Sequence, residues 1–227
     1  MKKLLLTLTM LLTLGFSLQG VAAQTPDSSG APMGEAMQAE GLESAYDRTY
    51  MVDFEALMAS PSADMAAMDS AAMMRVVSVT GMTFDSDDNA KAYVEDMKSQ
   101  IEDAQEAGEM PEGTEIRELE DVDIDKDGII ATLSMEDMGV NSAIMVFVDG
   151  NQVFMIVAID VDVESAEAKV TDIAKYVADA DIENDEVTFN EDGTSTGGVF
   201  DRMPEAGSDL VGDLPSVTDS VLQEAGE

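Results

Sequence analysis

Residues Asn141–Asp160 read NSAIMVFVDGNQVFMIVAID, and this stretch predicts the centre of the fold. Two apolar runs, 143–148 and 153–159, flank Asp149-Gly150, a pair that suits a tight turn because glycine adopts positive φ without steric cost. The runs are rich in Val, Ile and Phe and too short for typical helices, so they predict a β-hairpin. Neither run alternates apolar with polar residues. Both faces of the hairpin should therefore be covered, one by helices and the other by a different part of the chain.

Two amphipathic helices are expected, one before the hairpin and one after it. Asp85-Ser86 offers capping side chains, and apolar residues then recur at helical spacing until about Gly108. Ser165 is expected to cap the second helix, whose apolar face reaches Val177. One helix before the hairpin in the sequence and one after it predict a fold that contains both helices and a sheet.

Further strands are expected around these elements. The β-rich run 75–84 contains Gly81, which we interpret as a bulge. Strands are also expected at 119–125 and 129–135, joined by a turn at 126–128. Residues 45–60 are compatible with a strand or a helix, and a strand at 49–54 is favoured. Neighbouring strands with flanking helices predict an α+β domain with an antiparallel sheet of about five strands and two helices.

The first 23 residues have the composition of a secretory signal peptide. Lys2 and Lys3 precede the apolar run 4–18, and Val21-Ala22-Ala23 provides a small-residue cleavage site. Thr, Ser and Gln interrupt the run, which falls short of the roughly 20 apolar residues of a membrane-spanning helix. We therefore expect a secreted or periplasmic chain with no membrane span after cleavage. The absence of Cys excludes disulfides and a lipid-modified N-terminus.

The charge of the chain is strongly one-sided. It has 48 acidic and 11 basic residues and a formal net charge of −37. Such a charge argues against nucleic acid or an anionic membrane as a partner. The acids are spread along the chain rather than packed into one block, which is typical of a solvated surface. Adaptation to high salt, where a short screening length weakens self-repulsion, is the favoured interpretation, and a dedicated cation-binding role is the alternative.

Composition divides the chain into four parts. After the signal peptide 1–23, residues 24–44 are rich in Gly, Pro, Ser and acids and predict a disordered linker. The α+β domain is expected at 45–182, and residues 183–227 are expected to form an acidic extended tail with one or two docking points. The order of elements is loosely similar to that of small extracytoplasmic α+β domains of the PsbP type. The topology and the hairpin at 146–151 carry this likeness, and no functional motif accompanies it.

The sharpest motif is Asp123-x-Asp125-x-Asp127-Gly128, which matches the start of an EF-hand calcium loop. Alternate carboxylates suit a hard cation, and Ca²⁺ is the one cofactor that this pattern suggests. However, Ser134 occupies the twelfth position, where a bidentate Glu is required, and no helix precedes the loop. We favour the interpretation that these acids face solvent around a hairpin turn.

Other chemistry has weaker support. Five methionines between 58 and 74 could offer thioethers to Cu(I), but an Ala/Met helix packed on the sheet is the favoured interpretation. The chain has no His and no Cys, and it lacks esterase-elbow, P-loop and dinucleotide-binding motifs. We therefore expect no catalytic residues and no enzyme. The favoured function is a non-catalytic domain that binds a protein or envelope partner in high salt, with calcium binding at 123–128 as the alternative.

Overall fold

The computed structural model describes residues 39–52, 75–108, 110, 113–122, 124–135, 140–190, 192–205 and 215–223. The expected signal peptide, nearly all of the linker and the methionine-rich segment lie outside these residues. Among the helices of the described residues, none is both long enough and apolar enough to cross a membrane.

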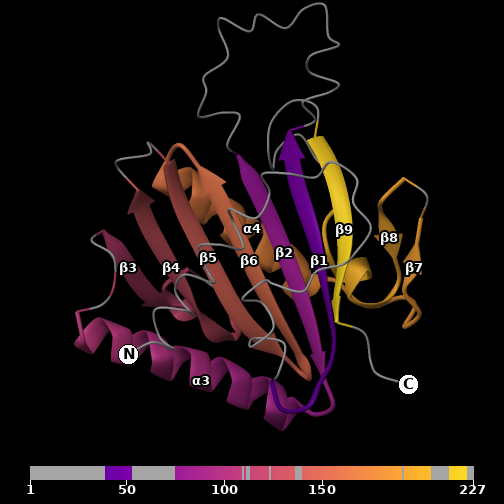
Figure 1. The fold of residues 1–227 in the computed structure, drawn as a ribbon, viewed down its shortest axis with the longest axis horizontal. Helices are drawn as coiled ribbons and strands as arrows, with labels where there is room; N and C mark the ends of the chain where they lie inside the picture. Colours follow the sequence, from indigo (N-terminus) through magenta and orange to yellow (C-terminus); the bar gives the residue numbers. More distant parts are fainter. Residues whose placement is uncertain are drawn as a thin grey trace, which may run out of the picture.

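The described residues form one large sheet, two long helices and several short elements (Figure 1). In chain order these are β1 (Leu42–Val52), β2 (Val76–Phe84), α3 (Asp87–Glu106), β3 (Thr114–Glu118), η4 (Leu119–Val122), β4 (Asp127–Met135), β5 (Val140–Asp149), β6 (Gln152–Asp160), α4 (Val163–Asp179), β7 (Thr188–Phe189), β8 (Ser195–Thr196), η6 (Gly198–Arg202) and β9 (Pro215–Gln223).

The main sheet has seven strands in the order β3-β4-β5-β6-β2-β1-β9, and every neighbouring pair is antiparallel. The α+β class is therefore confirmed, but the estimate of about five strands was too low. The strand expected at 119–125 was also misplaced, because β3 ends at Glu118 and the next four residues form a 3-10 helix. The acidic residues in this part of the sequence obscured the apolar spacing of β3, so the strand was expected too late in the sequence.

The hairpin at the centre of the sheet is confirmed. Val148 of β5 pairs with Val153 of β6, and Gly150 in the turn between them has φ of 62°. Every residue of β6 is buried. Phe147 and Phe154 stack across the pair with their ring centroids 5.5 Å apart. Burial on both faces explains why neither arm alternates apolar with polar residues.

The two helices lie on opposite faces of the sheet (Figure 1). α3 buries Val94 and Met97 against the face that presents Val146 and Val153. α4 lies on the other face, where its apolar residues meet those of β5 and β6. The expectation that the helices would share one face was therefore wrong, since each face of the hairpin receives its own helix.

The helix caps match the predictions only in part. Ser86 caps α3, and its hydroxyl accepts a hydrogen bond from the Asn89 N–H at 3.3 Å. The second helix begins earlier than predicted, because Asp162 is its cap and accepts from the Ser165 N–H at 3.0 Å. The Ser165 hydroxyl instead donates to Asp160 at 2.8 Å. Two capping residues three positions apart, Asp162 and Ser165, left the helix start ambiguous.

Residues 183–190, 192–205 and 215–223, named the C-terminal segment from this point, belong to the fold. β9 pairs with β1 at the edge of the main sheet, and β7 pairs with β8 as a separate hairpin. η6 packs on the same face of the sheet as α4. The described part of 183–227 is therefore not an extended tail, and the boundary expected at residue 182 does not separate a folded domain from a free end.

Gly81 accommodates η6 rather than forming a bulge. The pairing of β2 with β1 and with β6 continues through Gly81 without a shift. A Cβ at this position would lie 2.2 Å from a methyl carbon of Val199, which is buried in η6. The sheet therefore needs glycine here because the C-terminal segment approaches its backbone closely.

Candidate ligand-binding cleft

A buried arginine ties the C-terminal segment to β1. Arg48 donates to both carboxylate oxygens of Asp219 at 2.8 Å and to the backbone carbonyls of Ser195 at 2.6 Å and Met203 at 3.3 Å. Its guanidinium carbon lies 5.1 Å from the centroid of the Phe200 ring. Since the Asp219 side chain is fully buried, the bidentate pair satisfies a charge that would otherwise be costly in the interior.

A second buried arginine ties η6 to the central hairpin. Arg202 donates to the Gln152 side chain at 2.9 Å, to the Val177 carbonyl at 2.8 Å and to Asp149. Burial disfavours ionised Asp149, but hydrogen bonds from Lys126 and Arg202 outweigh this effect, and the pKa of Asp149 lies below its ordinary value. Arg202 therefore connects three elements at one point.

Asp201 arranges the loop between α4 and η6. Its carboxylate accepts hydrogen bonds from the N–H groups of Glu183 at 3.0 Å, Asn184 at 3.1 Å and Gly197 at 2.8 Å. Gly197 has φ of 80°, and a Cβ there would lie 2.0 Å from the Glu186 carbonyl oxygen. These bonds give the loop a defined backbone conformation, so the side chains that it carries are held in place.

This arrangement leaves a cleft of about 850 Å³ between the end of α4, the loop, β8, η6 and β9. Phe200, Met203 and Val217 supply apolar contacts to its lining. Arg48 is the one basic side chain among the described residues of the lining, and its hydrogen bonds are directed to Asp219 and backbone carbonyls. Five acidic residues complete the charged part of the lining: Asp181, Glu183, Asp192, Asp201 and Glu205.

Ser195 in the wall of this cleft has an unsatisfied hydroxyl. The residue is 3% exposed, and its backbone carbonyl accepts from Arg48. No group among the described residues forms a hydrogen bond with its Oγ. A buried hydroxyl without a partner destabilises a folded chain by about 1–3 kcal/mol. The Ser195 hydroxyl is therefore a buried polar group of a cleft-lining residue whose hydrogen-bonding capacity the described chain does not meet.

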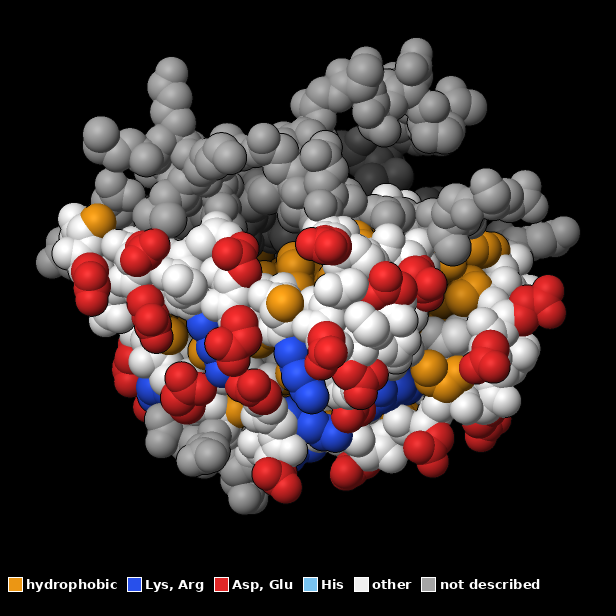
Figure 2. All heavy atoms as spheres, turned by 90° about the horizontal axis from the view of Figure 1, so that it is seen from below, with side chains coloured by type: hydrophobic (Ala, Val, Ile, Leu, Met, Phe, Trp, Pro, Cys, Tyr) orange, Lys and Arg blue, Asp and Glu red, His pale blue; other side chains and the backbone are white. Residues whose placement is uncertain are grey.

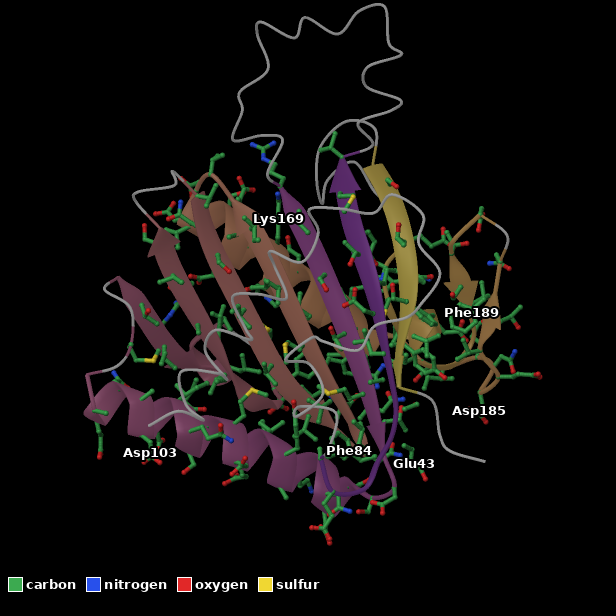
Figure 3. All side chains as sticks on the ribbon, viewed as in Figure 1. Glu43, Phe84, Asp103, Lys169, Asp185 and Phe189 are labelled. Atoms are coloured by element: carbon green, nitrogen blue, oxygen red, sulfur yellow. The ribbon has the colours of Figure 1, made fainter. Side chains whose placement is uncertain are left out.

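Exposed aromatic residues lie around the cleft. Tyr176, on its lining, is 48% exposed, and Phe189 on β7 is 47% exposed. The Phe189 ring lies 6.2 Å from the ring of Phe200, which lines the cleft. Figure 3 places Phe189 and Asp185 beside β9, on the opposite side of the molecule from Asp103 on α3. Phe189 therefore lies beside a residue of the cleft wall, outside the cleft itself.

The calcium candidates lie elsewhere, at the start of β4. Asp123 lies outside the described residues, and Asp125 is exposed. Asp127 accepts a hydrogen bond from the Lys98 ammonium at 2.5 Å, so a cation would have to compete with this ion pair. Among the described residues no group of three or more Asp or Glu could hold a metal. Because Asp123 is not part of that set, calcium binding at 123–128 stays a prediction.

A separate polar cluster lies on the α3 face of the sheet. Asp47 accepts hydrogen bonds from Ser78 at 2.6 Å, Thr80 at 2.8 Å and Thr49 at 2.7 Å. Burial raises the pKa of Asp47 above its ordinary value, although the three hydroxyls act in the opposite direction. Hydroxyls on neighbouring strands thus solvate a carboxylate in the sheet, which is a structural role.

The sequence alone missed the cleft, although it contained a clue. With 11 basic residues in the whole chain, each arginine is informative, and two of them lie in or against the C-terminal segment. The chain matches no known family. No curated protein and no solved structure matches it either. Its function must therefore be inferred from the geometry of the chain itself.

Proposed function

We propose that the chain is an exported, non-catalytic binding domain that holds a protein or envelope partner in surroundings of high salt. The acid-lined cleft of about 850 Å³ carries this proposal. A volume of this size lies within the ordinary range of binding pockets. Its walls come from several parts of the chain. Arg48 holds β8 and β9, and Arg202 holds η6, so the site is formed before a partner arrives.

The composition supports a binding role rather than catalysis. The chain contains no His and no Cys, so the commonest general base and the thiol nucleophile are both missing. The lining of the cleft offers carboxylates, hydroxyls and apolar contacts. Such groups bind by charge and shape, and binding in a preformed site needs no chemical step.

The distribution of charge supports a high-salt environment. Figure 2 shows acidic side chains scattered over the face that it presents, with the few basic side chains among them. At low ionic strength the carboxylates would repel one another and destabilise the compact state. At molar salt the screening length falls to about 3 Å, and the repulsion becomes weak.

A pull-down with matched charge variants tests the proposal. The bait is the full chain, and the prey is the native envelope fraction in molar KCl. The cleft variant is Asp181→Asn/Glu183→Gln/Glu205→Gln. The control is Asp103→Asn/Glu95→Gln/Glu102→Gln on the exposed surface of α3, which removes the same charge. We expect a partner that the wild type and the control retain and the cleft variant loses. Equal retention by both variants would contradict a binding role for the cleft.

A further inference from the structure

We propose that the cleft accepts an arginine-bearing segment of a partner protein, with the guanidinium at the carboxylates and the Ser195 hydroxyl as an additional hydrogen-bond acceptor. This inference rests on the proposed function and names the chemistry of the partner. It follows from three features: the charge of the lining, the unsatisfied hydroxyl and the exposed aromatic residues.

The charge of the lining determines the sign of the ligand. Asp181, Glu183 and Glu205 are exposed, and no hydrogen bond or ion pair engages their carboxylates within the described part of the chain. Arg48 cannot neutralise them, because its donors are directed to Asp219 and to backbone carbonyls. An anionic group would therefore be repelled, whereas a cation would gain several favourable interactions.

The Ser195 hydroxyl distinguishes a built site from an acidic surface. Its side chain is almost fully buried in the wall of the cleft and has no partner in the described chain. In the free chain this hydroxyl contributes nothing to stability and carries a desolvation cost. A ligand N–H that donates to this hydroxyl would supply the hydrogen bond that the described chain leaves unmade.

The aromatic residues favour arginine and a polypeptide over a small ion. A guanidinium stacks on an aromatic face and binds carboxylates through a planar set of donors. Tyr176 is exposed on the lining and can offer such a face. Phe189 lies next to Phe200 outside the cleft, where a small cation would not reach it. A segment of polypeptide can occupy the cleft and cover Phe189 at the same time.

The inference makes opposite predictions for stability and binding in one variant. Ser195→Ala removes an unsatisfied hydroxyl, so we expect the free chain to be as stable as the wild type or more stable. The same change removes an acceptor for a charged donor, so we expect about tenfold weaker binding of the ligand. Ser220→Ala on β9, an exposed position on the other face of the sheet, is the control and should change neither quantity.

Calorimetric titration of the full chain in molar KCl provides the test. The probe is a blocked peptide in which Arg alternates with Gly, and the comparisons are the same peptide with Lys or Glu in place of Arg, spermine and CaCl₂. At this salt concentration long-range attraction is screened over about 3 Å, so only contact binding survives. We expect one Arg peptide per chain, at least tenfold weaker binding by the cleft variant, and binding by the α3 control within twofold of the wild type.

The remaining outcomes separate the two proposals. Equal loss in the cleft and α3 variants would overturn the inference, because binding would then follow total charge. Equal or tighter binding of spermine or Ca²⁺ at the same site would replace a polypeptide with a small cation. If no cationic peptide binds, but the envelope partner is still lost from the cleft variant alone, the inference fails and the proposed function stands. If neither occurs, both fail.

Discussion

The β5–β6 hairpin and the C-terminal segment are held in the fold by different interactions. Apolar residues bury both faces of the hairpin, and its two strands are joined by a short turn. The C-terminal segment has few buried apolar residues, and Arg48 and Arg202 attach it to strands far away in the sequence. Hydrophobic burial is non-directional, whereas a bidentate ion pair fixes a geometry. The hairpin therefore provides stability, and the C-terminal segment provides a shaped surface.

Truncation of the hairpin core should have the largest effect. Phe154 is fully buried, stacks on Phe147 and lies beneath Arg202. We expect Phe154→Ala to lower the free energy of unfolding by about 4 kcal/mol, measured by denaturant titration in molar KCl. The hairpin and the C-terminal segment should unfold in one transition, because the C-terminal segment packs on the sheet that the hairpin stabilises.

An exposed phenylalanine supplies the control for this change. Phe189→Ala should alter stability by no more than about 0.5 kcal/mol. Comparable losses for the two phenylalanine variants would mean that the hairpin is not the stabilising centre.

Breaking one arginine anchor should affect the C-terminal segment more than the hairpin. Arg48→Met leaves Asp219 buried and unpaired, which should lower stability by about 3 kcal/mol. Hydrogen exchange should accelerate in β9 and η6 well before it does in β5 and β6.

The double variant Arg48→Met/Asp219→Leu tests the cause of that loss. Removal of both charges should restore most of the stability, because no unpaired charge remains. A double variant as unstable as the single one would show that packing of the arginine, rather than its charge, holds the segment.

The close approach of η6 to the sheet can be tested with a smaller change. Gly81→Ala places a methyl group against Val199, and we expect a loss of about 2 kcal/mol. Val199→Ala should relieve the clash, so the double variant should be more stable than the sum of the two single changes predicts. Additive losses would mean that η6 moves away at no cost.

The smallest expected effect is a change in the pH dependence of stability. The raised pKa of Asp47 means that the folded chain holds this proton more tightly than the unfolded chain does. The stability from this group is complete below pH 3.8 and declines as the pH rises through the folded-state pKa. Asp47→Asn should remove that decline, as measured by unfolding at a series of pH values.

Asp160 in the hairpin should behave in the opposite way. Burial disfavours its ionised form, but bonds from Lys169, Ser165 and the Val161 N–H outweigh burial and lower its pKa. The contribution of ionised Asp160 to stability is present above pH 3.8 and is lost as the pH falls through its folded-state pKa. Asp160→Asn should therefore be most destabilising near neutral pH. Asp47→Asn and Asp160→Asn should change the pH dependence of stability in opposite directions. Changes in the same direction would contradict the opposite pKa shifts of the two carboxylates.

The elements that could be predicted share a local pattern. The hairpin and α3 follow from runs of fewer than about 25 residues whose apolar spacing matches one secondary structure. β9, with the sequence PSVTDSVLQ, has no such apolar run and becomes a strand because β1 offers it a partner. The cleft was not predictable, because its walls come from several segments of the C-terminal part of the chain and Arg48 joins them from β1, more than 100 residues earlier.

The sequence by itself determined the hairpin, the two amphipathic helices, the acidic surface and the absence of His and Cys, because each is a property of composition or of local spacing. The tertiary structure decided that the helices take opposite faces, that the acidic C-terminal segment folds back, and that the Ser195 hydroxyl lies in a cleft wall without a hydrogen-bond partner among the described residues. These features depend on long-range pairs such as Arg48 with Asp219, and a linear pattern does not specify which distant charges will meet.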